Sequence, residues 1–162
     1  MNKTSQIQLR VTPAQKKDLT RRARAEGMDL TSWMLGRLVP PVRARLQELV
    51  HTLASASAPS FALAAIHDLL ADLHRGDFGV VTEGLALGSL EPFRANYLAA
   101  MVEATAARLR AVPPAWVRQV EPLTVPWFAS TLASVRLHLL TSSPPPFRTR
   151  NLFIDATVGA RV

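Results

Sequence analysis

A strict alternation of polar and apolar residues runs from residue 6 to residue 11 near the start of the chain. Alternate side chains of a β-strand point to opposite faces, so this segment predicts a strand with one apolar and one polar face. The apolar face consists of Ile7, Leu9 and Val11, and the polar face of Gln6, Gln8 and Arg10. Taken alone, so short an alternation favours an edge strand whose outer side chains are merely solvated.

Two helices are predicted directly after this strand. Thr12 and Gln15 have the spacing of a capping box, and Pro13 between them suits the first helical position. The first helix should run to about Glu26 and end at Gly27, which adopts the left-handed conformation without strain. The second helix should have Thr31 as its N-cap and end at Pro40–Pro41. Its apolar face is predicted to comprise Leu30, Trp33, Met34 and Leu38.

This order of strand, helix, glycine turn and helix, carried by Gln6–Val39, resembles the ribbon-helix-helix family of DNA-binding proteins, which includes Arc, MetJ and CopG. The resemblance implies that two chains pair their strands and insert the two-stranded ribbon into the major groove. It assigns base reading to the polar face of the strand, Gln6, Gln8 and Arg10. The side chains suit that role, because Gln pairs bidentately with adenine and Arg with guanine.

The resemblance also places a DNA phosphate at the start of the second helix, where Thr31, Ser32 and Trp33 would offer backbone amides. We expect further phosphate contacts from Lys3, Lys16 and Lys17. Family members often carry Glu near the position of Trp33, and this chain does not. The loss of an acidic group beside a phosphate should favour binding.

A segment of about forty residues is too small to bury one strand and two helices by itself. Pairing with a second copy would give each strand a partner and create a shared core, so an obligate homodimer is expected. The predicted dimer core comprises Ile7, Leu9, Val11, Leu19, Trp33, Met34 and Leu38.

Composition and charge agree with DNA binding. Of the formal net charge of +7, residues 1–40 contribute most, with eight Lys or Arg against three acidic residues. Cysteine is absent, which excludes disulfides and thiol chemistry. No apolar run has the length of a membrane span and the start of the chain is polar, so a cytoplasmic protein without membrane contact is expected.

Beyond residue 41 the pattern predicts a mostly helical domain, residues 41–146, and an extended tail, residues 147–162. Helices are expected over residues 42–54, 61–74 and 89–111. The second should have an inner stripe of Phe61, Ala65, Leu69 and Leu73. The third should be capped by Ser89 and have an inner face of Phe93, Tyr97, Met101, Thr105 and Arg108 or Leu109. Residues 77–90 are glycine-rich and should be irregular. The pattern of residues 128–140 favours a helix over a strand. Pro144–Pro146 should have an extended backbone, and Leu152–Ile154 should form a strand. The fold class is therefore mainly α.

Catalysis is not expected from this sequence. His67 and His74, with Asp68 and Asp72 nearby, match no standard zinc spacing, so exposed or core histidines are the favoured interpretation. The paired carboxylates Asp68 and Asp72, or Glu83 and Glu91, come with no nucleophile or phosphate-binding loop. No enzyme activity, metal or cofactor is therefore predicted.

Partner binding is the remaining role for the second part of the chain. Ribbon-helix-helix proteins with a C-terminal extension are often antitoxins, so the resemblance implies a protein that represses its own operon and neutralises a toxin. The tail has arginines and apolar anchors suited to groove binding, namely Phe147, Arg148, Arg150, Leu152, Phe153, Ile154 and Arg161. An equally weighted interpretation is that the tail completes the helical domain. Two other functions stay open: a repressor whose helical domain binds a small ligand, and a plasmid partition or relaxosome accessory protein.

Overall fold

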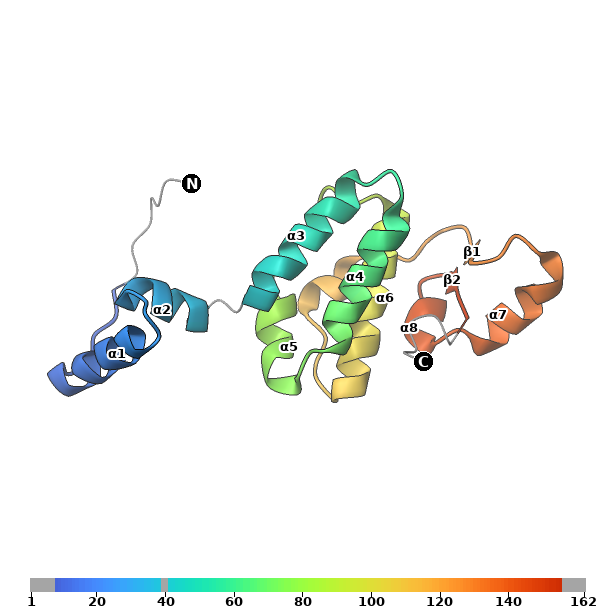
Figure 1. Cartoon of the computed structure of the whole chain (residues 1–162). Helices are drawn as coiled ribbons and strands as arrows, with labels where there is room; N and C mark the ends of the chain where they lie inside the picture. Colours follow the sequence, from blue (N-terminus) through green and yellow to red (C-terminus); the bar gives the residue numbers. More distant parts are fainter. Residues whose placement is uncertain (1–7, 39–40, 156–162) are drawn as a thin grey trace. The chain divides into compact units, whose positions relative to one another are not determined.

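The computed structural model describes residues 8–38 and 41–155. The chain divides into two compact units between residues 40 and 41 (Figure 1). The described structure is mainly helical, as predicted, with one short two-stranded sheet in the second unit.

The first unit contains α1 (Pro13–Ala25) and α2 (Leu30–Leu38), and residues 8–12 have no regular secondary structure in the single chain. The predicted capping box is present, since the Thr12 hydroxyl accepts from the Gln15 amide and Gln15 Oε1 accepts from the Thr12 amide at 2.9 Å. Gly27 ends α1 with φ of +69°. Its amide donates to Arg24 O, and the Met28 amide donates to Ala23 O, which is the Schellman pattern.

The predicted cap of α2 is wrong, because Asp29 rather than Thr31 occupies that position. The Asp29 carboxylate accepts from the Ser32 amide at 3.0 Å, and the Asp29 carbonyl accepts from the Trp33 amide at 2.9 Å. These are the two bonds of an N-cap residue. Aspartate satisfies the first turn as well as threonine does, and here it lies one residue before the helix starts.

The second unit is built around α3 (Pro41–Ser55), α4 (Pro59–Ala71), α5 (Arg75–Thr82) and α6 (Pro92–Leu109). The predicted helices over 42–54, 61–74 and 89–111 are confirmed with shifted ends. The stripe predicted for this second helix is only partly correct, since Leu73 is buried and Ala65 and Leu69 are partly buried, but Phe61 is 83% exposed. The buried side chains of α4 itself are Ala62, Ile66 and Leu70. Glu91 rather than Ser89 precedes α6.

Residues 75–82 form α5 although the sequence predicts an irregular segment there. Phe78 and Val81 are buried one turn apart, and the indole of Trp116 donates to Thr82 O at 2.8 Å. These contacts offset the low helix propensity of Gly76 and Gly79, which single-segment reasoning weighs too heavily. The left-handed residue that follows the helix is Gly84, with φ of +66°.

After α6 the chain continues through η1 (Ala115–Gln119), β1 (Trp127–Phe128), η2 (Ala133–Val135) and α7 (Arg136–Ser142), then α8 (Pro145–Arg148) and β2 (Leu152–Phe153). The helix predicted over 128–140 is therefore wrong in its first half and correct in its second. The proline run does not stay extended, because two of its prolines occupy the first positions of α8, where a missing amide costs nothing. The predicted strand at 152–154 is confirmed, and β2 pairs in parallel with β1.

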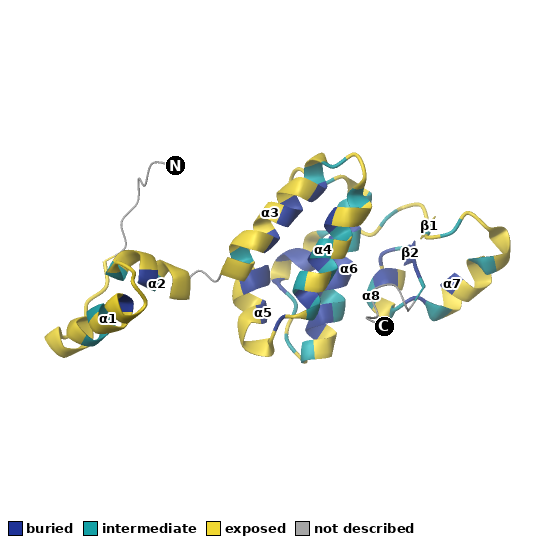
Figure 2. Cartoon of the chain, in the orientation of Figure 1, coloured by how far each residue is buried: buried dark blue, intermediate teal, exposed yellow. Residues whose placement is uncertain are grey.

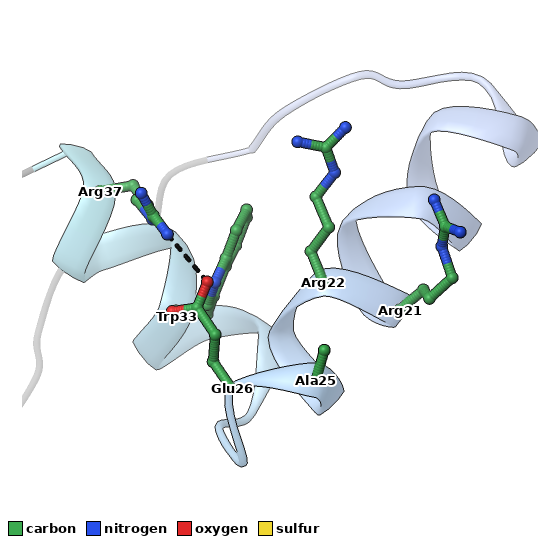
Figure 3. A pocket seen from close by; sticks show the side chains of 6 residues that line it. All are labelled: Arg21, Arg22, Ala25, Glu26, Trp33 and Arg37. Carbon is green, nitrogen blue, oxygen red and sulfur yellow. Dashed lines mark hydrogen bonds and ion pairs between the residues drawn. The ribbon is translucent and has the colours of Figure 1, made fainter.

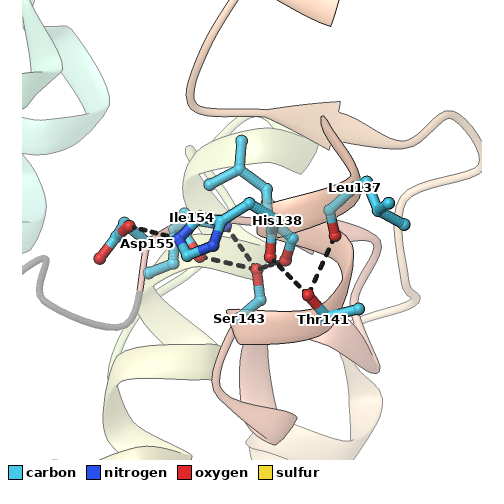
Figure 4. A network of polar contacts seen from close by, with 7 residues as sticks. Leu137, His138, Thr141, Ser143, Ile154 and Asp155 are labelled. Atoms are coloured by element: carbon cyan, nitrogen blue, oxygen red, sulfur yellow. Dashed lines mark hydrogen bonds and ion pairs between the residues drawn. The ribbon is translucent and has the colours of Figure 1, made fainter. Parts of the chain in front are cut away.

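The tail as far as Asp155 is part of the fold of the second unit. Leu152 and Ile154 are fully buried, and Ser143 Oγ lies 2.7 Å from Ile154 O and accepts from the Ile154 amide at 2.8 Å (Figure 4). His138 Nε2 lies 3.0 Å from Asp155 Oδ2 in the same network. These contacts join the tail to α7 and fix its last described residues.

Arg150 is also buried, at 7% exposure, and its guanidinium ties three segments together. Nη2 donates to Val117 O at 2.9 Å and lies 3.2 Å from Glu103 Oε2, while Nη1 donates to Val120 O at 3.2 Å. A buried guanidinium needs such partners, because desolvation of an unpaired charge is costly. Arg150 therefore has a structural role.

Candidate nucleic-acid interface

Most of α1 and α2 is exposed to solvent (Figure 2), and the basic residues of the first unit lie in these two helices and in the segment before α1. All seven basic residues between positions 8 and 38 are exposed: Arg10, Lys16, Lys17, Arg21, Arg22, Arg24 and Arg37. Three acidic residues, Asp18, Glu26 and Asp29, lie among them. The described part of this unit therefore carries a positive surface of the kind that attracts phosphates.

Asp18 neutralises only part of this surface. Arg21 forms an ion pair with one carboxylate oxygen, and Arg22 Nε lies 2.9 Å from the other. The hydrogen bond from Arg21 is the main cause that holds the pKa of Asp18 below its ordinary value. Both arginines remain largely exposed, so these pairs orient the guanidinium groups without removing them from solvent.

The predicted base-reading face is accessible where it is described. Gln8 and Arg10 are both exposed, and the apolar side chains between and after them are exposed too, Leu9 by 62% and Val11 by 38%. Gln6, Ile7 and Lys3 lie outside the described residues. In the single chain both faces of residues 8–11, the described part of the alternating segment, are thus open.

Residues assigned to the dimer core are incompletely covered within one chain. Trp33 is 9% exposed and packs in the unit, Leu19 and Met34 are half-buried, and the side chain of Leu38 lies outside the described residues. Met28 and Leu35 add exposed apolar surface, 43% and 41%. Among residues 8–37 only Ala23 and Trp33 are buried, which leaves this unit with a very small core of its own.

A shallow pocket beside Trp33 joins the two helices (Figure 3). Arg21, Arg22 and Ala25 line it from α1, and Arg37 from α2, with Glu26 between the helices. The Arg37 guanidinium lies 2.8 Å from Glu26 Oε1 and 5.4 Å from the centre of the Trp33 ring. This ion pair and cation–π contact fasten α2 to the end of α1.

The Trp33 indole N–H is buried beside the Glu26 carboxylate and makes no hydrogen bond of ordinary geometry with the described residues. Its approach is nevertheless the largest cause that lowers the pKa of Glu26, followed by the hydrogen bond from Arg37. The ionised form of Glu26 is therefore the one that the folded hairpin favours. Sequence reasoning missed Glu26 and Arg37, whose pairing depends on the angle between the helices.

The start of α2 already holds a carboxylate of the chain itself. The Ser32 and Trp33 amides, assigned to a DNA phosphate, donate to Asp29. A phosphate near this helix end would have to share the amides with Asp29 or contact Thr31 and the hydroxyl of Ser32. The Asp29 position was readable from the sequence, since Asp three residues before Ser32 is an N-cap spacing.

The residues assigned to partner binding are mostly not available on the surface. Phe147, Arg150, Leu152, Phe153 and Ile154 are all buried within the second unit, and only Arg148 of the described set is exposed. Arg161 lies outside the described residues. The alternative interpretation, that this segment completes the helical domain, is the one that the burial supports.

The part of the chain that the structure describes contains neither a metal site nor a membrane-spanning helix. No group of three His, Asp or Glu side chains there is arranged to hold a metal ion. No helix in the described ranges has both the length and the apolar character needed to cross a bilayer. The chain as a whole has no match among protein-family models, curated proteins or solved structures.

Proposed function

We propose that the protein is a sequence-specific DNA-binding homodimer that acts as a transcriptional repressor through residues 1–40. The single observation that carries this proposal is the joint exposure of Gln8, Arg10 and the basic side chains of α1, next to an alternating segment without a strand partner among the described residues. A second chain would turn that segment into an antiparallel ribbon with a polar face directed at DNA.

Dimer formation is supported by the exposed apolar side chains. Leu9 and Val11 would lie on the inner face of the ribbon, where pairing removes them from water. A unit with so small a core gains most of its stability from such a partner. Leu9→Asp should therefore shift the protein from dimer to monomer in sedimentation velocity. The matched control is Leu137→Asp, an exposed leucine of the second unit, which should leave the dimer unchanged.

Salt dependence provides the test of DNA binding. Affinity for a duplex should fall steeply with salt, because each neutralised phosphate releases counterions. Lys16→Gln with Lys17→Gln should reduce the slope of log K against log salt by about 1 for each phosphate that is no longer neutralised. Removing two exposed arginines of the second unit, Arg45→Gln with Arg75→Gln, is the charge-matched control. Equal slopes for the two double variants would place the DNA-binding surface elsewhere.

An antitoxin is the second candidate, and one observation favours it. Several large apolar side chains on α7 and in the segment before it are exposed, namely Val125, Leu132, Leu137 and Leu140. Such a surface suits a protein partner and replaces the buried tail as the proposed contact. Leu132→Asp with Leu137→Asp should then abolish neutralisation of a toxin encoded beside this gene, while DNA binding persists. A plasmid partition or relaxosome role has no comparable supporting observation.

A further inference from the structure

An elongated groove of about 740 Å³ runs along the second unit between α4 and the C-terminal segments. The floor is one face of α6, from Phe93 through Tyr97 and Met101 to Arg108. This is the stripe that the sequence assigns to the inside of the helix, whereas the core takes the neighbouring face with Leu98, Val102 and Ala106. At about 1.5 Å per residue, the floor from Phe93 to Arg108 is about 22 Å long.

The first end of the groove is aromatic. The Phe93 ring centre lies 4.7 Å from that of Trp127 and 5.7 Å from that of Tyr97, and Tyr97 meets the edge of Phe147 at 5.3 Å. Burial among these groups raises the pKa of the Tyr97 phenol. Leu63 of α4 also lines the groove. The walls are thus mostly apolar, as in small-molecule sites of about 300–1,000 Å³.

The second end is polar and nearly balanced in charge. Arg108 Nη2 donates to Leu70 O at 2.9 Å, so the C-terminal ends of α4 and α6 meet there. Asp68 and His67 of α4 and Thr105 of α6 line the groove beside Arg108. The guanidinium and the carboxylate carry opposite unit charges, and the helix C-termini add only partial negative charges, one of which the Arg108 guanidinium already contacts. A fully charged group of either sign would therefore gain little here. Hydroxyl and imidazole groups supply both donors and acceptors.

We propose that this groove binds an elongated, uncharged small molecule with an apolar body against the aromatic end and a hydroxyl or amide head at the polar end. Length favours a chain-like ligand over a compact one, because the lining residues follow almost the whole of α6. Balanced charge at the head favours an uncharged polar group, since a full charge would meet a like charge in Asp68 or Arg108. The site belongs to the second unit alone and does not depend on the DNA-binding proposal.

The direct test is calorimetric titration of the full-length protein with hexanol, octanol and decanol. Affinity should rise about fourfold for each added methylene while the groove fills, the factor expected from burial of one methylene group. The carboxylate and the ammonium compound of the same chain length should each bind at least about tenfold more weakly than the alcohol. Absence of saturable binding by any alcohol, or tighter binding of either charged compound, would overturn the proposal.

Variants locate the site and test the head group. Ala64→Trp introduces a large ring at an exposed lining position of α4 and should abolish binding. Phe61→Trp, on the exposed side of the same helix, is the matched control and should bind as the parent does. Asp68→Asn should improve binding of the carboxylate, and Arg108→Gln that of the ammonium compound.

The oligomeric state shows whether a small molecule or a second copy of the chain occupies the groove. Sedimentation of Ala64→Trp should match that of the parent, because a small-molecule groove contributes nothing to assembly. Loss of an oligomer in this variant would show that another chain fills the groove, and would overturn the proposal. Unchanged alcohol binding by Ala64→Trp would likewise overturn it.

Discussion

The two units differ in how much of their own apolar surface they cover. In the second unit Leu46, Leu53, Ile66, Leu98 and Leu152 are completely buried, and one core joins the helices α3 to α6 with η1, α8 and β2. In the first unit the described residues bury only Ala23 and Trp33, while Leu9 and Val11 remain exposed. This difference is the reason for our proposal that a second chain completes the first unit, whereas the second unit has a core of its own.

The largest expected effect on stability comes from removing one large buried side chain from the core of each unit in turn. Trp33→Ala should destabilise the first unit by about 3–5 kcal/mol, which exceeds what so small a core can lose, and should abolish DNA binding. Leu98→Ala should destabilise the second unit by about 2–5 kcal/mol. Calorimetry should show that each substitution lowers only one thermal transition. A single transition shifted by both would mean that the units fold as one.

Arg150→Ala tests whether the tail is structural. Removing one member of a fully buried ion pair typically costs about 3–5 kcal/mol. The ion-pair part of the cost should be smaller here because the Glu103 carboxylate is 36% exposed, but two backbone carbonyls are also left without their donor. The midpoint temperature of the second unit's thermal transition should fall strongly, while the sedimentation coefficient and the affinity for DNA stay unchanged. Arg148→Ala, two residues earlier and exposed, is the control with little effect. Equal stability of the two variants would contradict the structural role.

Arg10→Ala has a smaller and more selective effect. Losing a bidentate hydrogen-bonded pair should cost about 1–3 kcal/mol per half-site at one base pair, while affinity for unrelated DNA falls only slightly. Lys16→Ala should instead weaken all sequences by a similar factor. Competition binding with the operator and with unrelated duplexes measures both quantities. A uniform loss in Arg10→Ala would remove this residue from base reading.

The smallest effect concerns pH. The pKa of Glu26 is lower in the folded hairpin than in the unfolded chain, so its contribution to stability is present above the unfolded pKa and lost as pH falls through the folded value. The first unit should therefore weaken in acid below about pH 4, and Glu26→Gln should flatten that dependence. Circular dichroism with both proteins between about pH 6 and pH 3 gives the comparison. If the variant and the parent lose stability in acid to the same extent, the contacts of Glu26 with Trp33 and Arg37 are not a source of the pH dependence.

Local signals predicted the first unit well and the second only in part. Thr12, Pro13 and Gly27 fix α1 through neighbours in sequence, so its start and end were readable. The α5 helix depends on Trp116, more than thirty residues away, and the buried tail depends on carbonyls of η1 and its flank. Such long-range contacts leave no periodic trace in the segment itself.

The candidate sites show the same division. Gln8, Arg10 and Lys16 were identified from spacing and charge within one segment. The Trp33–Glu26–Arg37 cluster and the groove along α6 arise only when helices are packed, because their residues come from different elements. The stripe from Phe93 to Arg108 was visible in the sequence, but an inner face that lines a groove has the same period as one that fills a core.

Selection of bound duplexes from a random DNA library by the full-length protein is the decisive measurement of sequence-specific DNA binding. We expect an enriched motif with two related half-sites, one for each chain of the dimer, and loss of one preferred base pair per half-site in Arg10→Ala. Enrichment of the same motif by Arg10→Ala and Gln8→Ala would contradict base reading by the ribbon. No enrichment by the parent protein would contradict sequence-specific DNA binding altogether.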